Sequence, residues 1–326
     1  MKRVVVTGAT GFVGANLAKR LLADQHEVHV LVRPGRTQWR LDPIKDRLHM
    51  HSADLCSGAD LTRQLKEISP HWIFHLAVYG AYSDQRDRAE MVQTNYVGTC
   101  NLISAALDAG FESFVNTGSS SEYGLKDHPA SEREWLDPNS YYAATKAGAT
   151  LFCRYTAKET GMRIPTLRLY SVYGPLEAAG RLMPTLIRHA MLGMLPPLVH
   201  PDIARDFIYV DDVTDAYIRA ASMPLPEPGV VYNVGSGRQT TIRELVEITR
   251  SVFDVSSPPD WGTMKARQWD TTAWVGDIQA IGADLAWSPH TDLACGLRKM
   301  RDWFLAEPDL STLYPIDPPA HSHSAR

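Results

Sequence analysis

The sequence predicts an α/β fold built on a doubly wound parallel sheet, with a smaller C-terminal α/β lobe. Short apolar runs alternate with helical patterns as far as about residue 169, which is typical of parallel strands with helices on both faces. A glycine-rich turn directly follows the first of these runs. Beyond residue 169 the chain is richer in proline and less regular, so we expect a loop-rich lobe there.

Each expected strand is a short apolar run, and the helices between them carry apolar residues at helical spacing. In chain order, the strand candidates are Val4–Val6, Val28–Val32, Trp72–Ala77 and Phe114–Asn116. The helix candidates are Ala15–Ala23, Val92–Ala109 and Tyr142–Thr160.

These patterns divide the 326 residues into two folded parts and a tail. Residues 1–169 form the first domain, and we expect residues 205–235 to return to it through Phe207–Val210 and Val230–Val234. Residues 170–305 form the smaller lobe. Residues 306–326 include "PIDPPAHSHSAR", which has too little apolar surface to pack, so this span is expected to be a disordered tail.

Composition argues against several classes of protein. A formal charge of −4 and a pI near 6.3 provide no basic surface for nucleic acid or an anionic membrane. No apolar run approaches the roughly 18 residues of a membrane span. The N-terminal "MKRVVVTGATG" is typical of a first strand rather than a signal peptide.

Cysteine and histidine spacing does not indicate a metal enzyme. The four cysteines are far apart and contain no Cys-x-x-Cys, which also fits a reducing cytoplasm better than a disulfide framework. His71 and His75 have i, i+4 spacing but fall in an expected strand, and His321 and His323 lie in the tail. We therefore expect no catalytic metal.

The motif "TGATGFVG" places Gly8, Gly11 and Gly14 between the first strand and the first helix. Glycines there permit a tight turn and close approach of the backbone to a diphosphate, while the helix N-terminus offers N–H groups to the anion. The spacing is G-x-x-G-x-x-G rather than the usual G-x-G-x-x-G. The strand–turn–helix context predicts a Rossmann-type dinucleotide site in residues 1–169.

The end of the second strand bears on which dinucleotide binds. NAD sites place an acid there for the ribose diol, whereas an arginine accommodates the 2′-phosphate of NADP. Here "VHVLVRPGR" has Arg33 where the acid would stand and Arg36 just beyond. NADP is the expected cofactor, with NAD as the alternative.

"SYYAATKAG" places Tyr142 and Lys146 four residues apart on one face of an expected helix. A lysine ammonium near a phenol favours the phenolate and lowers the tyrosine pKa. A tyrosine tuned in this way exchanges a proton with a carbinol or a carbonyl. The pair therefore indicates acid–base chemistry beside the dinucleotide.

Taken together, the motifs resemble the extended short-chain dehydrogenases/reductases, a family of nucleotide-sugar epimerases, dehydratases and ketoreductases. The resemblance extends to about residue 305 and rests on these stretches: "TGATGFVG", "ADL", "HLA", "TNYVGT", "YYAATK", "LRLYSVYGP", "RDFIYVDDV" and "YNVGSG". It implies that residues 170–305 form a substrate-binding lobe for a nucleotide sugar. By the same resemblance, Val92–Ala109 and Tyr142–Thr160 would pair two subunits in a homodimer.

The resemblance also implies roles by position. Tyr142 would be the acid/base, Lys146 would bind the nicotinamide ribose, and Ser119 would hydrogen-bond the reacting oxygen. Cofactor contacts would come from Gly8, Gly11, Phe12, Val13, Gly14, Arg33, Arg36, Asp54, Leu55, Leu76 and Ala77. Substrate contacts would come from Ser120, Ser171, Arg205 and Arg267. Ser171 stands where many members carry asparagine, and the two arginines match residues that bind the substrate phosphates.

The stretch "NTGSSSEYG" bears on the reaction. Dehydratases of the family carry a glutamate two residues before the tyrosine of this stretch, where this chain has Ser121, with Ser120 before it. Glu122 comes one position late, and in an extended segment a one-residue shift turns a side chain to the other side. Dehydration is therefore disfavoured.

Two enzymatic reactions remain open. The favoured one is NADPH-dependent reduction of a nucleotide-linked 4-keto-6-deoxy sugar at C4, because the loop, Arg33 and "ARQWDTTAWVGD" resemble the corresponding reductases. The alternative is a 4-epimerase with tightly bound NAD. A non-catalytic NADP-binding protein is a third hypothesis, disfavoured because both Tyr142 and Lys146 are present.

Overall fold

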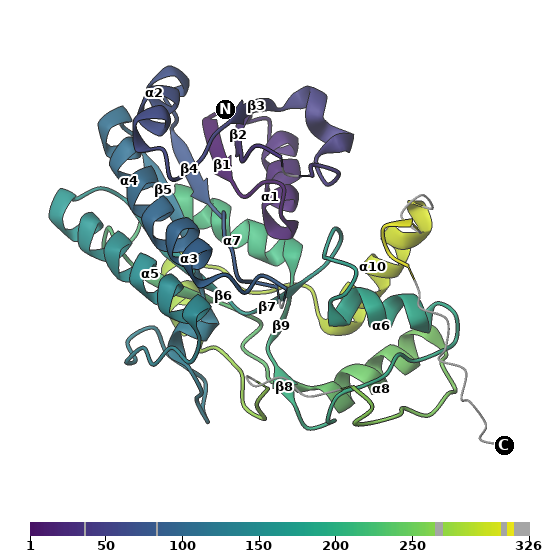
Figure 1. Cartoon of the computed structure of the whole chain (residues 1–326). Coiled ribbons are helices and arrows are strands. Elements are labelled where there is room, and N and C mark those ends of the chain that lie inside the picture. Colours follow the sequence, from purple (N-terminus) through teal and green to yellow (C-terminus); the bar gives the residue numbers. More distant parts are fainter. Residues whose placement is uncertain (36, 83, 265–269, 308–311, 316–326) are drawn as a thin grey trace.

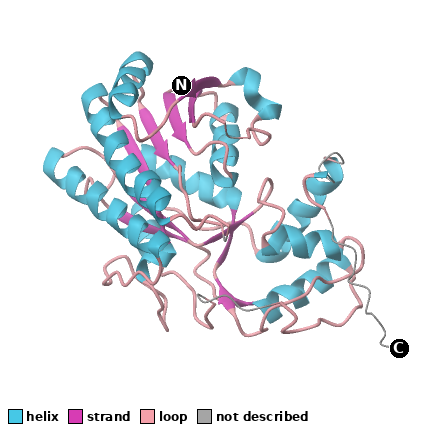
Figure 2. Cartoon of the chain, in the orientation of Figure 1, coloured by secondary structure: helices cyan, strands magenta, loops and turns pink. Residues whose placement is uncertain are grey.

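The computed structural model describes residues 1–35, 37–82, 84–264, 270–307 and 312–315, and a parallel seven-stranded sheet lies at its centre (Figures 1 and 2). The strand order is β10-β6-β5-β4-β1-β2-β3. Their bounds are β1 Arg3–Thr7, β2 Glu27–Val32, β3 His49–Ser52, β4 Trp72–His75, β5 Ser113–Ser119, β6 Thr166–Leu169 and β10 Val231–Val234. The order reverses between β1 and β4, and in such sheets ligands bind beyond the strand carboxyl ends at that point.

The central strands are apolar throughout because both faces of the sheet are covered. In β1, Val4 and Val6 face one hydrophobic cluster and Val5 faces another, and all three are fully buried. Val5 lies opposite His29 of β2 and Ile73 of β4 in the parallel register. Continuous apolar runs of this kind are typical of parallel strands buried on both faces.

Two sets of helices cover the two faces (Figure 1). One set packs on the face of Val4 and Val6 and consists of α1 Phe12–Ala23, α7 Val210–Ser222 and α9 Gln279–Leu285. The other packs on the face of Val5 and consists of α2 Gly58–Ile68, α4 Gly98–Ala109 and α5 Tyr141–Thr160. Shorter helical segments are η1 Asp42–Arg47, α3 Arg88–Met91, η2 Val92–Val97 and η3 Ser120–Tyr123.

The smaller lobe has its own core and lies beside the sheet (Figure 1). Its helices are α6 Leu182–Ala190, α8 Ile242–Phe253 and α10 Leu293–Ala306. Two short sheets join it to the first domain, β7 Ser171–Tyr173 with β9 Phe207–Tyr209, and β8 Ala204–Arg205 with β11 Thr240–Thr241. No described helix is both long and apolar enough to cross a lipid bilayer.

The structure corrects the expected path of the chain in three places. Val231–Val234 joins the main sheet beside β6, but Phe207–Tyr209 pairs with β7 in a separate sheet, so the expectation that it returns to the main sheet is wrong. The helix expected at Val92–Ala109 begins with a π-helical turn, η2, before α4. Within the expected tail, Tyr314 is buried against Trp303 and Phe304.

Candidate active site

The glycine turn between β1 and α1 packs directly against the end of β4. Gly8 has φ +71°, and a Cβ at this position would lie 2.5 Å from the backbone nitrogen of Ala77. A Cβ on Gly14 would lie 2.3 Å from the carbonyl oxygen of Gly8. Helix α1 begins after Gly11 with neither a side-chain cap nor an acid in its first turn. Its N–H groups are thus available to an anion, as expected for a diphosphate site.

A buried polar chain holds β1, β4 and α4 together behind this turn. His75 Nδ1 is 2.7 Å from Thr7 Oγ1, and His75 Nε2 is 2.8 Å from Thr99 Oγ1. Burial, with a smaller effect from the charge of Lys146, lowers the pKa of His75 to about 3. His75 is therefore uncharged at neutral pH. Each of its ring nitrogens is hydrogen-bonded to a threonine hydroxyl, so its role is to link β4 to β1 and α4.

Directly after β2, Arg33 forms an ion pair with Glu90, which also accepts a hydrogen bond from Thr94. Asp54 lies nearby at the surface, where its carboxylate accepts a hydrogen bond from the backbone of Cys56. The arginine expected to hold a 2′-phosphate thus already has a carboxylate partner. Arg36 lies outside the described residues.

Tyr142 and Ser119 meet at the carboxyl end of β5. Ser140 caps α5 by accepting a hydrogen bond from the backbone of Ala143, which places Tyr142 on the first turn of the helix. Burial raises the pKa of Tyr142, while a hydrogen bond with Ser119 and the charge of Arg181 oppose that rise. The phenol therefore has a serine hydroxyl beside it, as suits a group that exchanges a proton with a bound carbinol or carbonyl.

Lys146 lies one turn further along α5, with only 2% of its surface exposed. Burial lowers its pKa, and the charge of Glu122 partly opposes this. Among the described residues, no hydrogen bond joins its ammonium to a protein acceptor. Lys146 lies on the same face of α5 as Tyr142, as the i, i+4 spacing predicts. A buried ammonium without an acceptor fits the hydroxyls of a bound ribose.

Glu122 is fully buried. Its carboxylate accepts hydrogen bonds from Arg168 Nε at 2.8 Å, Thr150 Oγ1 at 3.0 Å and the backbone nitrogen of Ser119 at 2.8 Å. These contacts agree with the one-residue shift predicted from the sequence. Glu122 therefore holds the site together and is not available as an acid for dehydration.

Asn95 is a site residue that the sequence pattern did not single out. It lies in the π-helical turn η2, is fully buried, and makes hydrogen bonds to both the N–H and the C=O of Tyr79. Its amide also donates to Thr145 Oγ1, which lies beside Lys146 on α5. A π-helical turn at a functional site is a common way to aim one side chain out of helical register. The apolar spacing of a helix does not distinguish a π-helical turn from an α-helical one, so this pattern did not identify Asn95.

The expected substrate residues lie along the junction of the two lobes. Ser120 is buried beside Ser119, and Ser171 begins β7, where its backbone donates to the Asp206 carbonyl. Arg205 Nη2 is 2.5 Å from Asp270 Oδ1, and its guanidinium lies 5.9 Å from the centre of the Trp274 ring. Arg267 lies outside the described residues.

A second group of residues missed by the sequence analysis lies on the loop after β7. Arg181 acts electrostatically on Tyr142 and lies 5.8 Å from the ring of Tyr82. Its nearest acid is Glu177, at 3.6 Å, which is 5% exposed and has one carboxylate oxygen without a partner. Burial raises the pKa of Glu177 to about 8, although Arg181 opposes the shift. Near neutral pH a protonated Glu177 leaves the charge of Arg181 uncompensated.

The open helix N-terminus and the unsatisfied Lys146 ammonium fit the diphosphate and ribose of a nicotinamide dinucleotide, so the chain is an NAD(P)-dependent enzyme of the short-chain dehydrogenase/reductase type. It belongs to the NAD dependent epimerase/dehydratase family, whose model matches residues 4–235. The resemblance drawn from the motifs is thereby confirmed.

Similar proteins act on nucleotide sugars. A UDP-glucose 4-epimerase of Mycolicibacterium smegmatis is 32% identical, over 93% of this chain and 98% of its own. A GDP-6-deoxy-D-mannose reductase of Pseudomonas aeruginosa is 28% identical to this chain, and the match covers 93% of this chain and 97% of the reductase. The solved structure of MoeE5 in complex with UDP-glucuronic acid and NAD has a TM-score of 0.81 and 28% identity, over 94% of this chain and 99% of that one. The chain is thus a member of the nucleotide-sugar epimerase, dehydratase and reductase group.

The buried Glu177 predicts a pH dependence of stability. Its folded pKa, about 8, is above the ordinary value of 4.5, so between these values the folded state binds a proton that the unfolded state has lost. Stability should therefore fall as pH rises through this window, by on the order of 2–4 kcal/mol from this group. Urea unfolding of the wild type and of Glu177→Gln at several pH values measures the difference.

The matched control is Glu159→Gln, which changes an exposed glutamate on α5. It should keep the wild-type slope, whereas Glu177→Gln should flatten it. Equal slopes for the wild type and Glu177→Gln would show that Glu177 is ionised in the folded protein.

Proposed function

We propose that the protein is an NAD-dependent 4-epimerase of a nucleotide sugar. The observation that carries the proposal is the pairing of Ser119 with Tyr142 in a cleft where the nearby carboxylate, Glu122, is fully committed to Arg168, Thr150 and the Ser119 backbone. Such a site can move one proton on and off a carbinol oxygen. An elimination requires a further acid–base group, and Glu122 cannot serve as one while it is held by these three partners.

Two observations support epimerisation over reduction. The relative at 32% identity is a 4-epimerase, and MoeE5 has been solved with NAD. The ion pair with Glu90 already gives Arg33 an anionic partner, and the Glu90 carboxylate would repel a 2′-phosphate. NAD therefore fits this end of the cleft better than NADP.

In this mechanism Tyr142, as the phenolate, takes the proton from the C4 hydroxyl of the sugar and later returns it to the C4 oxygen. Ser119 holds that oxygen through its hydroxyl, and Lys146 binds the ribose beside the reacting carbon. The chemistry that bound NAD supplies is reversible hydride transfer at C4. Between the two transfers the 4-keto sugar must turn over within the cleft, so that the hydride returns to its other face.

Arg181 supports a substrate with an acidic sugar. Its guanidinium is near enough to influence Tyr142, and Glu177 provides little compensating charge when protonated. A carboxylate on the sugar would accept a paired hydrogen bond from such a group. MoeE5, one of the similar proteins, has been solved in complex with UDP-glucuronic acid.

The second candidate is the NADPH-dependent reductase of a 4-keto-6-deoxy nucleotide sugar. Arg33 at the end of β2 favours it, as does the similarity to the GDP-6-deoxy-D-mannose reductase of Pseudomonas aeruginosa. For this reaction Arg33 would exchange Glu90 for the 2′-phosphate, and Tyr142 would only donate its proton. The two candidates share the site and differ in whether the reduced cofactor is consumed.

We also propose that the protein is a homodimer formed through η2 and α5. Apolar side chains are exposed along these two adjacent elements: Val92 44%, Tyr96 38%, Leu151 56% and Tyr155 63%. A contiguous apolar face of this kind is typical of an interface.

The dimer is tested by molar mass from light scattering. The wild type should have the mass of two chains, and Leu151→Glu, which places a charge on the apolar face, should shift the protein to one chain. Leu192→Glu is the control, because Leu192 is 57% exposed on the smaller lobe. A wild type with the mass of one chain, or an unchanged mass for Leu151→Glu, contradicts this interface.

The function is tested by incubating the enzyme and NAD with UDP-glucuronic acid or UDP-glucose and following the C4 epimers by NMR. The acidic sugar should be the better substrate. Tyr142→Phe should lower kcat by about 10²–10⁴-fold, since it removes the proton donor and acceptor. Tyr141→Phe should retain activity, because Tyr141 is exposed and stacks under Arg88 through its ring alone.

Consumption of NADPH with a 4-keto-6-deoxy nucleotide sugar, without formation of any C4 epimer, would replace the epimerase with the reductase. Full activity of Tyr142→Phe would contradict both.

A further inference from the structure

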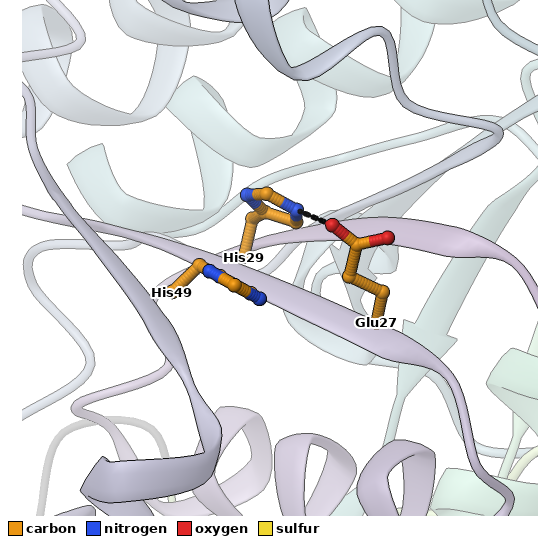
Figure 3. A group of neighbouring side chains, drawn as sticks. All are labelled: Glu27, His29 and His49. Carbon is orange, nitrogen blue, oxygen red and sulfur yellow. Dashed lines mark hydrogen bonds and ion pairs between the residues drawn. The ribbon is translucent and has the colours of Figure 1, made fainter.

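A cluster of imidazoles and one carboxylate lies at the β2–β3 edge of the main sheet (Figure 3). Glu27 and His29 are two residues apart on β2 and therefore on one face, and His29 is the direct partner of His49 in the parallel register. Three ligand atoms, one from each of these residues, lie within 4.8 Å of one another. We propose that Glu27, His29 and His49 bind a divalent transition-metal ion such as Zn²⁺.

The spacing of two of the ligand atoms already suits a metal. Zn²⁺ binds imidazole nitrogen and carboxylate oxygen at about 2.0–2.2 Å in tetrahedral geometry, which places two ligand atoms roughly 3.3 Å apart. His29 Nε2 and Glu27 Oε1 are 3.1 Å apart. Their hydrogen bond can thus be exchanged for two metal bonds with almost no movement of either side chain.

The third ligand needs a small rotation that its position permits. The His49 ring is stacked on that of His29, with centroids 4.6 Å apart and planes at 19°. His49 is exposed and lies on the edge strand, so its ring can turn about its side-chain torsions to bring a nitrogen into the gap. Water would complete the coordination on the open side.

A third histidine, His51, supports the orientation of the central ligand, His29. His51 Nε2 lies 3.0 Å from His29 Nδ1. When His29 binds a metal through Nε2, its remaining proton sits on Nδ1 and is donated to His51. A metal-bound histidine almost always donates its other ring N–H to a neighbouring acceptor in this way.

The position of the cluster indicates a structural role. Glu27 and His49 are the first residues of β2 and β3, whereas the cofactor segments follow the carboxyl ends of the strands. A metal here would join the edge strand β3 to β2, far from the reacting atoms. The effect should therefore be on stability and not on turnover.

The experiment measures Zn²⁺ binding to the full-length protein by isothermal titration calorimetry, in the background His321→Ala/His323→Ala to remove the histidines near the C-terminus. One Zn²⁺ per chain should bind and raise Tm. Loss of an outer-shell partner alone costs metal affinity about 10–100-fold, so His49→Ala should weaken binding by more than about tenfold. It should also abolish the rise in Tm. Because His49 is exposed, this variant should keep the fold, which circular dichroism checks.

His200→Ala is the matched control, since it removes an exposed histidine outside the cluster and should leave Zn²⁺ affinity unchanged. The proposal is overturned if the background protein binds no Zn²⁺ at submillimolar concentrations. It is equally overturned if His49→Ala binds Zn²⁺ as tightly as its parent, since the cluster would then be a hydrogen-bonded network only.

Discussion

The buried ion pair between Glu122 and Arg168 is the interaction on which the geometry of the site depends. Burying two charges is costly unless their remaining hydrogen-bonding capacity is met, and here it is met on both sides. Glu122 also accepts from Thr150 on α5 and from the backbone of Ser119, while Arg168 Nη1 donates to the Tyr123 hydroxyl. One pair thus ties β5, β6 and α5 together. It fixes the serine at the end of a strand relative to the tyrosine on the neighbouring helix, and it removes the carboxylate from the chemistry.

A second group of contacts fixes the position of the smaller lobe relative to the main sheet. Arg40 donates to the carbonyl of Leu176 at 2.8 Å and to that of Thr10 at 3.3 Å, so the loop after β7 is held against the glycine turn. Asp206, fully buried between β8 and β9, accepts hydrogen bonds from the backbone of Ser236, Gly237 and Gly276. The loops of the smaller lobe are therefore anchored to the sheet that carries the cofactor site. The loop after β7 carries Arg181, whose charge lowers the pKa of Tyr142.

The parts of the site that could be predicted are those fixed within one element or one turn. The i, i+4 spacing on a helix places Tyr142 and Lys146 on one face, and the glycine turn follows from its strand and helix. Contacts between residues that are far apart in the sequence could not be predicted. Arg33 meets Glu90 from a separate helix, and Arg181 reaches Tyr142 through the loop after β7. Likewise, the partner of β9 is β7 rather than a main-sheet strand, because apolar character alone does not specify which strand pairs with which.

In the proposed epimerase, hydride leaves C4 and returns to the same sugar while that sugar stays bound. The most direct measurement uses a mixture of substrate deuterated at C4 and substrate labelled with carbon-13 elsewhere, converted in the presence of NAD and analysed by mass spectrometry. We expect deuterium to stay at C4 of the molecules that carried it, with no transfer to the carbon-labelled product and no net reduction of cofactor. Deuterium that appears in carbon-labelled product, or in released cofactor, would contradict this mechanism.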